Sequence, residues 1–557
     1  MRIGMALYAS NPFSPLPMES LRYVIRSLKD AASSRHELVF LPQTYICASP
    51  EEEQAMNEEL VRSCDVIVGS ASVSVPETRH RIGSDVPIVS LTLGVLSRGG
   101  FGVDVQVPYL TSNDVLVVNC TSDRELARKF FTNAQVRLLP FAIDGAQFYP
   151  LDEAERRTAR EKLGFRERDR ILVYSGRTTL QKNVHTLLKV FSVVQRVVPD
   201  ACLVIAGPVV EHGAPEFGVA PVRLANTIDK LVAGLGIPPG RVVMMSQVPA
   251  PRLRELYGIA DVKVNLSLHH DENFGLAQVE AMACGTPVIG TAWGGLKDTI
   301  VDGVSGYRVS TSLTPLGVKA SWWEAVNRIV ALLRDPAARE RFRDSCVRHA
   351  SERYSQARYE STLLEILSDT VRGRGRPPEP LRPSAFAREL WGTCHPRTGP
   401  RPPFQRGPRS YELYQEMIGP IAGATAEAVP AGEAPAPGQV LTLAAPVTRD
   451  EDGRLRSNDP MYPFEIDVPS AHALAFEAIL SVLREEPAIT VERLCGHPAA
   501  GGRGASHTLA WILDRGLLLR TRPVDGWLPP GTIDRRMSEP FFRIERPDHR
   551  SVDFFTA

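Results

Sequence analysis

The stretch from residue 271 to residue 290 reads DENFGLAQVEAMACGTPVIG, and it predicts a helix followed by a strand. We expect the helix over residues 277–283 and a short buried strand over residues 287–290. Runs of these two kinds alternate through about the first 370 residues. Such alternation predicts parallel sheets that helices cover on both faces.

The alternation comes in two successive sets. In the first set we expect a helix over residues 21–32 and strands at residues 3–9, 37–41, 66–69, 88–93 and 115–119. In the second set we expect helices over residues 184–198 and from residue 252, and strands at residues 170–175, 201–206 and 262–266. The sets join near residues 140–150. This order predicts two doubly wound lobes with a cleft between them, and ligands of such sheets bind at the carboxyl ends of the strands.

The composition is that of a soluble, multidomain protein. The chain has 557 residues, too many for one core, and a formal net charge of zero, so no overall attraction to nucleic acid or to anionic membranes is expected. The eight cysteines include no C-x-x-C pair. This pattern argues against a zinc site or a disulfide framework and favours a reducing cytoplasm. No apolar run is typical of a signal peptide or of a membrane-spanning helix.

The composition changes after residue 372. Residues 373–462 are rich in Pro, Arg and Ala, and we expect a linker there. A compact pattern returns over residues 463–557, with helices expected at residues 471–484, 490–495 and 506–514. It predicts a small, separable, mainly helical domain that resembles a winged helix. Docking of an acceptor or a partner protein is favoured over nucleic-acid binding, because residues 506–514 contain no Lys or Arg.

Two glutamates accompany the helix predicted at residues 277–283. Glu272 precedes that helix and Glu280 lies within it. Gly275 and Leu276 would stand at its N-terminus, where free backbone N–H groups and the helix dipole favour a diphosphate. An ionised carboxylate only accepts hydrogen bonds, which suits the donating hydroxyls of a sugar. Taken alone, the stretch is also compatible with an acidic helix start and a surface glutamate.

A basic segment follows the strand expected at residues 170–175. Gly176 would let the chain turn tightly where the strand becomes a loop. Arg177 and Lys182 then lie at the carboxyl end of the strand. Arg offers phosphate oxygens a fork of donors, and Lys offers a point charge. A solvated basic loop is the alternative for this segment on its own.

Together the two segments resemble the donor lobe of the large retaining glycosyltransferase family, often called family 4, that includes glycogen and sucrose synthases and bacterial mannosyltransferases. The resemblance covers about residues 115–370. Beyond the segments already quoted, it is carried by motifs that follow one another in the family's order, at residues 138–140, 143–144, 148–150, 182–183, 257, 260–261, 285–289, 294–296 and 302–306.

This resemblance implies the GT-B fold, with two Rossmann-like lobes, and the transfer of a hexose from a UDP- or GDP-linked donor with retention of configuration. The three expected catalytic residues are Arg177 and Lys182, which would bind the donor diphosphate, and Glu272, which would contact the hydroxyls of the transferred sugar. Glu280 would hold the ribose. The other expected donor-binding residues are Gly176, Asn273, Phe274, Gly275 and Leu276. The family generally works without a bound metal, so we expect neither a metal ion nor a cofactor.

The resemblance also implies the division of the chain. Residues 1–145 would form the acceptor-side lobe and residues 146–352 the donor-binding lobe. Residues 353–372 would form a closing helix that returns to the first lobe. The family's motifs are complete before residue 372, so we expect the C-terminal domain to contribute no catalytic residue.

The first lobe departs from the family pattern. Many members have a Gly-rich loop after the first strand, whereas the loop at residues 10–17 has no glycine. Leu93 stands where many members have a histidine. These departures leave open an alternative from another class, a catalytically degraded GT-B protein that serves as a binding or scaffold protein.

Two further groups of charged or polar residues lie outside these motifs. A solvated face is favoured over weak peripheral membrane contact for the basic side of the helix at residues 21–32, formed by Arg22, Arg26 and Lys29. His269 and His270 precede Asp271. Adjacent residues rarely reach one ion together, so a structural or acceptor-lining role is favoured over metal binding.

Overall fold

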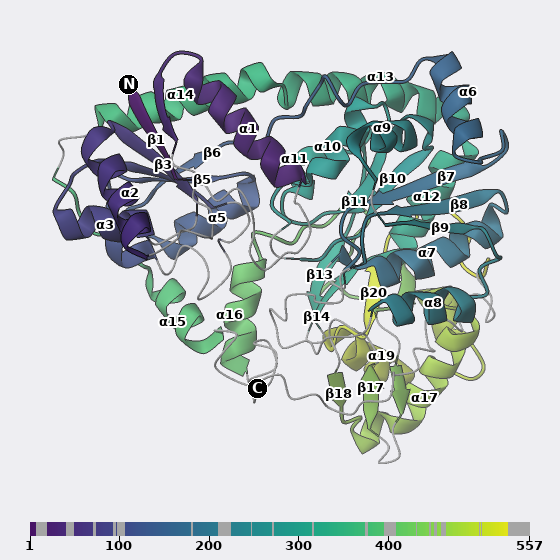
Figure 1. The fold of residues 1–557 in the computed structure, drawn as a ribbon. Helices are drawn as coiled ribbons and strands as arrows, with labels where there is room; N and C mark the ends of the chain where they lie inside the picture. The colour runs from purple at the N-terminus through teal and green to yellow at the C-terminus, as the bar shows by residue number, and fades with distance from the viewer. Residues whose placement is uncertain are drawn as a thin grey trace.

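In the computed structural model, the chain folds into two lobes side by side, each built around a six-stranded sheet (Figure 1). The structure describes residues 1–532 except residues 7–18, 41–49, 71–73, 93–95, 97–105, 180–181, 210–223, 247, 270–271, 315–316, 374–376, 395–407, 431, 445–446, 450–453, 458–463, 501 and 503. Within this described part, no helix is both long enough and apolar enough to span a membrane.

The first lobe is a parallel sheet with the strand order β2-β1-β3-β4-β5-β6. Its strands are β1 (Arg2–Ala6), β2 (Glu37–Phe40), β3 (Val66–Ser70), β4 (Ile88–Leu91), β5 (Val115–Val118) and β6 (Gln135–Leu138). Its helices are α1 (Glu19–Ser33), α2 (Pro50–Ser63), α3 (Ser74–Ile82), the short η1 (Val107–Tyr109) and α5 (Thr121–Phe130). Ile3 and Met5 pack toward α1 on one face, and Ile67 packs toward α2 on the other. Coverage of both faces explains why these strands are continuous apolar runs.

The second lobe is also a parallel sheet, with the order β12-β11-β10-β7-β8-β9. Its strands are β7 (Arg170–Ser175), β8 (Ala201–Ala206), β9 (Val242–Met245), β10 (Val262–Asn265), β11 (Val288–Thr291) and β12 (Gly306–Val309). Its helices are α6 (Glu153–Lys162), α7 (Val184–Val197), α8 (Leu224–Gly234), α9 (Ala250–Ile259), α10 (Leu276–Ala283), α11 (Leu296–Thr299) and α12 (Trp322–Arg334). A hairpin of β13 (Thr311–Thr314) and β14 (Gly317–Ala320) follows β12.

The strand order of the second sheet changes direction between β7 and β10. The chain builds outward from β7 through β8 and β9, and then from β10 through β11 and β12 on the other side. At such a switch point, the loops that leave the two central strands diverge at the carboxyl edge and leave room for a ligand. The two doubly wound lobes predicted from the sequence are confirmed.

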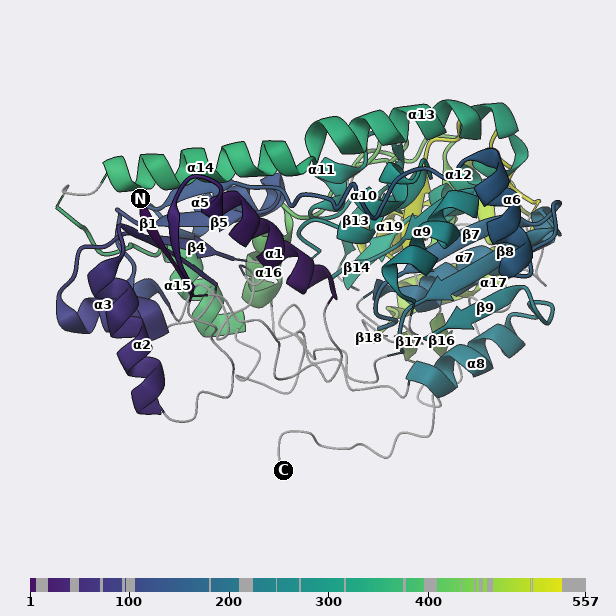
Figure 2. The ribbon, with the colours of Figure 1, turned by 45° about the horizontal axis from the view of Figure 1, so that its top comes forward.

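Two long helices connect the lobes. Figure 2 shows α13 (Pro336–Arg353) lying over the second lobe and α14 (Gln356–Arg372) continuing over the first. α14 packs in the core of the first lobe, where Leu363 and Leu367 are fully buried with β1 and α1. The ion pair between Arg137 of β6 and Asp369 of α14, at 2.8 Å, adds a polar contact at the rim of this packing.

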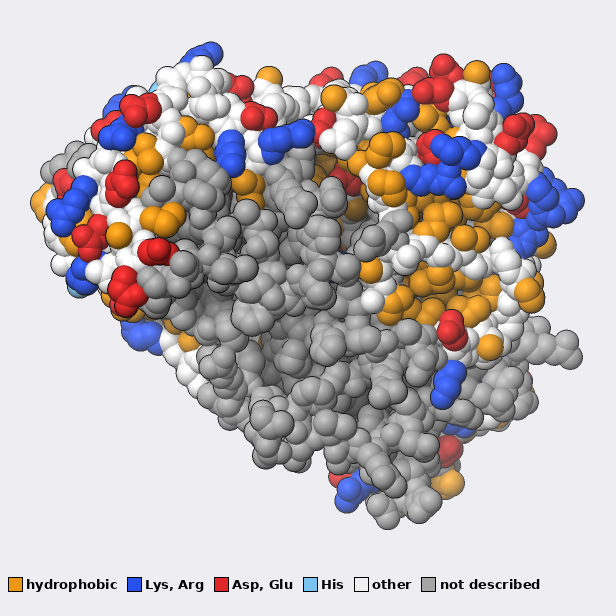
Figure 3. Space-filling model, viewed as in Figure 1, with side chains coloured by type: hydrophobic (Ala, Val, Ile, Leu, Met, Phe, Trp, Pro, Cys, Tyr) orange, Lys and Arg blue, Asp and Glu red, His pale blue; other side chains and the backbone are white. Residues whose placement is uncertain are grey.

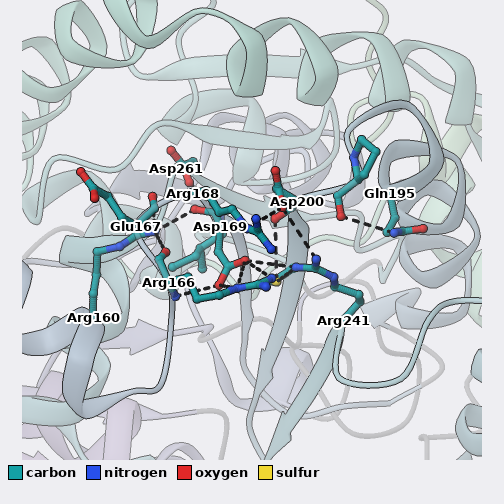
Figure 4. A network of polar contacts seen from close by, with 12 residues as sticks. Arg160, Arg166, Glu167, Arg168, Asp169, Gln195, Asp200, Arg241 and Asp261 are labelled. Atoms are coloured by element: carbon teal, nitrogen blue, oxygen red, sulfur yellow. Dashed lines mark hydrogen bonds and ion pairs between the residues drawn. The ribbon is translucent and has the colours of Figure 1, made fainter.

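The amino edge of the second sheet is held by charged side chains (Figure 4). Just before β7, Asp169 accepts hydrogen bonds from Arg166 at 2.8 Å and from Arg241, which precedes β9, at 3.1 Å. Just before β10, Asp261 accepts a hydrogen bond from the backbone N–H of Ile171 at 2.7 Å. These contacts fix the starts of the strands relative to one another. The loops at the opposite, carboxyl edge therefore extend from a rigid sheet.

The structure corrects the linker expected at residues 373–462, because much of this segment is folded against both lobes. It contains α15 (Ala385–Cys394), α16 (Pro408–Ile418), β15 (Val440–Leu443) and β16 (Val447–Arg449). Phe386 of α15 stacks on Phe130 of α5 with ring centroids 6.0 Å apart, and Trp391 meets the same ring edge-on at 5.5 Å. A few well-placed aromatic residues therefore anchor a segment whose overall composition is typical of a linker.

Residues 419–425 continue from α16 along the second lobe. The backbone N–H of Gly294 donates to the carbonyl of Ile421 at 2.8 Å, and that of Thr311 donates to the carbonyl of Gly423 at 2.9 Å. Ile421 itself is completely buried. Because these contacts are made mainly by the backbone, no pattern of side chains in the sequence predicts them.

The C-terminal domain combines helices with antiparallel strands, whereas a mainly helical domain was expected. β15 is the centre of one sheet, between β19 (Ala488–Thr490) and β20 (Leu518–Thr521). β17 (Leu455–Ser457) is the centre of a second, between β16 and β18 (Phe464–Ile466). The helices are α17 (Ser470–Glu485), α18 (Val491–Cys495) and α19 (Ala505–Asp514).

This domain is also joined to the second lobe, so the separable domain expected from the sequence is corrected. Val440 and Ala488 lie in the same core as the second lobe. Trp322 of α12 donates its indole N–H to the carbonyl of Leu443 at 3.2 Å. The domain therefore completes one side of the second lobe.

The surface carries both signs of charge. Figure 3 shows basic and acidic side chains interspersed over the described parts of one face. On α1, Arg26 pairs with Asp144 at 2.8 Å, and the side chain of Arg22 lies outside the described residues. A basic side chain of α1 thus takes part in an intramolecular contact.

We predict that Leu413→Ala destabilises the whole protein by about 2–5 kcal/mol, because Leu413 of α16 is completely buried and its truncation leaves a cavity. The matched control is Glu412→Ala, an exposed neighbour on the same helix, for which a change within about 0.5 kcal/mol is expected. Chemical denaturation of the full-length protein measures both. If Leu413→Ala leaves the free energy of unfolding unchanged, α16 contributes little to the fold, as expected of a linker.

Candidate functional site

Two loops of opposite charge meet at the carboxyl edge of the second sheet. One follows β7 and carries Lys182, and the other follows β10 and carries Glu272. Lys182 Nζ donates a hydrogen bond to Glu272 Oε2 at 2.5 Å. The two side chains are only 22% and 7% exposed, so the ion pair is largely withdrawn from water. Because β7 and β10 are neighbours in the sheet, its topology brings together residues 90 positions apart.

The Glu272 carboxylate is held in its ionised form. Burial by itself raises its pKa, but the charge and hydrogen bond of Lys182, together with a hydrogen bond from Ser267, outweigh burial and leave the pKa below its ordinary value. Since the pKa is lowered in the folded state, the stabilisation from this pair is present at neutral pH and is lost as the pH falls through the acidic range. At neutral pH, Glu272 can therefore only accept hydrogen bonds.

Arg177 lies at the same edge with its side chain exposed. Its backbone is fixed, because Tyr174 Oη donates to its carbonyl oxygen at 2.7 Å. Gly176 precedes it with φ of 132°. Gly207 packs so closely on this turn that a Cβ at Gly207 would lie 2.0 Å from the Gly176 carbonyl oxygen. The turn thus fixes the backbone position of Arg177, while its guanidinium group stays accessible to an anion.

Asn183 orients the loop that carries Lys182. Its φ is 55°, and it is the one residue other than glycine with a positive φ in the described part of the chain. Asn tolerates this left-handed conformation better than most residues. Its side-chain Nδ2 donates to the carbonyl of Leu266 at 2.9 Å, just beyond the end of β10. Asn183 therefore ties the loop after β7 to the loop after β10, and α7 starts directly after it.

Helix α10 starts at the end of the Glu272 loop. Its N-cap is Gly275, with φ of 83°, and no side chain caps the helix. Leu276, the first residue of the helix, is partly exposed. An uncapped N-terminus keeps its first backbone N–H groups for an anion, and the helix dipole favours negative charge there.

A pair of glycines holds the Glu272 loop in place. The backbone N–H of Gly295 donates to the carbonyl of Glu272 at 2.7 Å. A Cβ at Gly294 would lie 2.2 Å from that carbonyl oxygen, and a Cβ at Gly295 would lie 2.2 Å from the carbonyl carbon of Asn273. Only glycine allows this approach. Both glycines belong to a motif quoted from the sequence, but their close approach to the backbone of residues 272 and 273 was not predicted.

Two residues predicted to bind a donor have their side chains engaged elsewhere. The Phe274 ring is buried between Phe141 and Tyr354, with edge-on centroid distances of 5.3 Å to each. Asn273 Nδ2 donates to Asn119 Oδ1 of the first lobe at 2.9 Å. Their side chains therefore hold the lobes together beside the site.

The junction between the lobes is polar at this point. Asp298 of α11 accepts hydrogen bonds from the backbone N–H and the hydroxyl of Thr121, each at 2.6 Å. Ser122 Oγ donates to the carbonyl of Gly294 at 3.3 Å. A carboxylate from the second lobe thus sits at the N-terminus of α5 of the first, where the helix dipole favours it.

Glu280 lies in α10, partly buried. Tyr257 Oη donates to Glu280 Oε2 at 3.4 Å, and the same hydroxyl lies 2.6 Å from Ser175 Oγ at the end of β7. Burial raises the pKa of Glu280 to about 7, against an opposing effect of Lys263. Glu280 therefore differs from Glu272 in being poised between its protonated and ionised forms at neutral pH.

Sequence reasoning missed Lys263. It lies in the middle of β10 and is completely buried. Its Nζ donates to the carbonyl of Ser175 at 3.3 Å and lies 5.0 Å from the centroid of the Tyr174 ring. The signal was present, because Lys263 stands between Val262 and Val264 in a segment that is itself predicted to be a buried strand.

Several residues raised in the sequence analysis lie outside the described residues. They are His270, Asp271, Leu93 and the loop at residues 10–17. Among the residues that the structure describes, no three or more His, Cys, Asp and Glu side chains gather as a group that could hold a metal ion.

Comparison with known proteins adds to this geometry. Residues 155–345 match the family model described as Glycosyl transferases group 1. D-inositol 3-phosphate glycosyltransferase of Geodermatophilus obscurus is 35% identical over 240 residues, which cover 43% of this chain and 51% of that relative. Alpha-maltose-1-phosphate synthase of Mycobacterium tuberculosis is 28% identical over 268 residues, which cover 46% of this chain and 65% of that relative. The chain spans about half the length of the first curated relatives it matches.

Solved structures share the fold. The structure of Alr3699/HepE from Anabaena in complex with UDP has a TM-score of 0.52 at 16% identity, and the match covers 66% of this chain and all of that one. A glycosyltransferase from Rickettsia africae has a TM-score of 0.51 at 13% identity, covering 66% of this chain and 98% of that one. The family match covers the second lobe and the solved structures share the two-lobed arrangement, so the second lobe resembles the group 1 glycosyltransferases and the chain has the GT-B fold.

Proposed function

We propose that this protein transfers a hexose from a nucleotide-sugar donor, UDP- or GDP-linked, to an acceptor that is still to be identified. The observation that carries the proposal is the ion pair of Lys182 and Glu272 at the carboxyl edge of the second sheet, beside an exposed arginine and the uncapped start of α10. Folding alone does not call for this set, because a largely buried ion pair adds little stability over apolar residues. HepE, which shares the fold, was crystallised with UDP and with UDP-glucose.

The proposed chemistry follows from the charges. As the bond between the sugar and the diphosphate breaks, negative charge develops on the leaving diphosphate. Arg177, Lys182 and the N-terminus of α10 stabilise that charge, and these fixed donors need no reorganisation at the moment of reaction. Glu272 accepts hydrogen bonds from the sugar hydroxyls, and Glu280 accepts them from the ribose. Attack on the face that the diphosphate leaves, with a phosphate oxygen taking the acceptor's proton, then retains configuration without a protein nucleophile.

The remaining parts of the proposal concern metal, acceptor and location. Two cations and a helix N-terminus neutralise the diphosphate, so a divalent metal is not required. The C-terminal domain docks the acceptor or a partner and supplies no catalytic residue. The cytoplasm is the proposed location, because the described cysteines are all free thiols.

The first test concerns the diphosphate. Lys182→Ala is expected to lower turnover of the donor by a factor of about 10²–10³, because one fixed donor to the developing charge is removed. Release of UDP or GDP from the sugar nucleotide, with water as a slow acceptor, measures it. The control is Lys162→Ala, a surface lysine that pairs with Glu255 and lies on α6, before β7 begins. Unchanged turnover in Lys182→Ala would remove the lysine from the mechanism.

The same assay separates the enzyme from a degraded scaffold. A wild-type protein that binds UDP or GDP but never consumes the sugar nucleotide, with water or with any acceptor offered, would favour the scaffold.

The second test concerns metal. Donor binding and turnover are expected to survive treatment with EDTA, since protein cations do the neutralising. Calorimetry and the turnover assay are run with and without the chelator. Restoration of lost activity by added Mg²⁺ or Mn²⁺ would contradict the metal-independent mechanism.

The third test concerns the glycine pair. Gly295→Ala is expected to weaken UDP or GDP binding markedly and to destabilise the fold by about 1–3 kcal/mol, because the new Cβ meets backbone atoms of the Glu272 loop. Gly145→Ala is the control, since a Cβ there meets nothing within 4 Å. Calorimetry measures binding, and chemical denaturation measures stability. Wild-type affinity in a folded Gly295→Ala protein would show that the loop does not shape the site.

A further inference from the structure

Lys297 of α11 fastens the segment at residues 419–425 to the second lobe. Its Nζ donates hydrogen bonds to the carbonyl oxygens of Pro420 at 2.6 Å and of Ala422 at 3.1 Å. Both carbonyls lie just beyond Ile418, the last residue of α16. A lysine that donates to carbonyls at the C-terminus of a helix is also favoured by the helix dipole. Lys297 therefore holds the chain in one place where it leaves α16.

The helix before this segment is itself anchored, on the first lobe. Lys129 of α5 donates to the carbonyl of Glu416 in α16 at 3.0 Å. Leu413 of α16 lies in the same core as Phe130 of α5. The 419–425 segment thus starts from a fixed point on one lobe and is fastened by Lys297 to the other.

The 419–425 segment pairs with the turn that supports the Glu272 loop. Ala422 and Trp293 form an isolated antiparallel bridge. The backbone N–H of Gly294 donates to the carbonyl of Ile421 at 2.8 Å. Consecutive residues of the segment therefore lie along the turn and are joined to it by the backbone.

The same turn holds the Glu272 loop on its other side. The indole N–H of Trp293, which is completely buried, donates to the carbonyl of His269 at 2.6 Å. The backbone N–H of Gly295 donates to the carbonyl of Glu272 at 2.7 Å. The glycines of the turn leave no room for a Cβ between the two backbones. A shift of the 419–425 segment is therefore passed through the turn to the loop.

We propose that Lys297 is a positioning residue for the transferred sugar. It fastens the 419–425 segment against the turn, and the turn then holds the Glu272 carboxylate where it accepts hydrogen bonds from the sugar hydroxyls. This inference rests on the proposed function, in which Glu272 has that task. Arg177 and Glu280, proposed for the diphosphate and the ribose, lie after β7 and in α10 and take no part in these contacts.

This role predicts a loss of affinity that depends on the sugar. Without the hydrogen bonds of Lys297, the loop is held less firmly and Glu272 loses contact with the sugar hydroxyls. A hydrogen bond to a charged group is worth a factor of about ten in affinity. A nucleoside diphosphate carries no transferred sugar, so its affinity is expected to stay nearly unchanged. A lysine that only supported the fold would, when removed, weaken both ligands equally.

The experiment is calorimetry of the full-length protein with UDP-glucose and UDP, and with GDP-mannose and GDP. Lys297→Met keeps the length of the side chain without its donors. It is expected to weaken binding of the nucleotide sugar about tenfold relative to the matching diphosphate. Lys297→Arg keeps donors for the two carbonyls, so much of the wild-type ratio of affinities is expected to return.

A second variant loosens the same contact without removing the ammonium group. A Cβ at Gly423 would lie 2.8 Å from Lys297 Cδ and 3.1 Å from the carbonyl oxygen of Ala292. Gly423→Ala is therefore expected to push the segment away from the turn and to change the ratio of affinities in the same direction as Lys297→Met.

Arg160→Met is the matched control. Arg160 also donates to backbone carbonyls, those of Arg166 and Asp169 at 2.8 Å each, but it lies at the amino edge of the second sheet (Figure 4). Chemical denaturation reports how far each variant is destabilised. Destabilisation by Arg160→Met is expected to leave the ratio of the two affinities unchanged.

The wild-type protein supplies a measurement that does not depend on whether the variants fold. Coupling between two sites is reciprocal, so a sugar bound at Glu272 must stabilise the contact between the turn and the segment. The backbone N–H groups of Gly294 and Thr311 donate to the carbonyls of Ile421 and Gly423. Their hydrogen exchange is expected to slow when the nucleotide sugar replaces the diphosphate as the bound ligand.

Equal weakening of both ligands by Lys297→Met, or no weakening of either, overturns the inference. Exchange at these two N–H groups that is the same with the diphosphate and with the nucleotide sugar overturns it as well. So does a wild-type protein that binds UDP or GDP but gains no affinity from either sugar. Absence of any UDP or GDP binding by the wild-type protein overturns the proposed function instead, and the inference with it.

Discussion

The contact between the Gly294–Gly295 turn and the backbone of residues 272–274 is the constraint on which the rest of the structure depends. The two backbones approach so closely that neither glycine has room for a Cβ. The turn fixes the carbonyl of Glu272 and leads into α11, whose Asp298 reaches the start of α5 in the first lobe. Its other side pairs with Ile421. One tight backbone contact therefore sets the site loop, the lobe junction and the path of the C-terminal segment together.

The two glutamates of the site differ because their partners differ. Glu272 has a cation at hydrogen-bond distance, so its pKa is lowered despite burial. Glu280 has only the hydroxyl of Tyr257 as a described hydrogen-bond partner, and the charge of Lys263 does not outweigh burial, so its pKa rises to about 7. Environments that push two carboxyl groups in opposite directions assign them different tasks. In this protein the pKa of one carboxyl group lies below its ordinary value, and that of the other lies at about 7.

The sequence was sufficient to predict that Lys182 and Glu272 lie at one edge, because each follows a strand and parallel strands end on the same side of a sheet. It was not sufficient to predict the hydrogen-bond partner of Lys263, because Ser175 lies 88 positions earlier in the chain. The position of Phe274 in the sequence, two residues after Glu272, also did not reveal that its ring packs between Phe141 and Tyr354. Position along the chain locates a loop, whereas the direction of each side chain depends on tertiary neighbours.

Residues 373–462 show why composition misled the prediction of a linker. Composition measures how much apolar area a segment carries, but folding depends on whether that area lies on one face. In α16, the buried residues Leu413, Tyr414, Met417 and Ile418 recur at the spacing of a single helical face, while Glu412 and Glu416 are exposed. The prolines and arginines around them lower the apolar content without disturbing that face. Where composition and periodicity disagree over so short a window, periodicity is the better guide, because it reports the surface that packs.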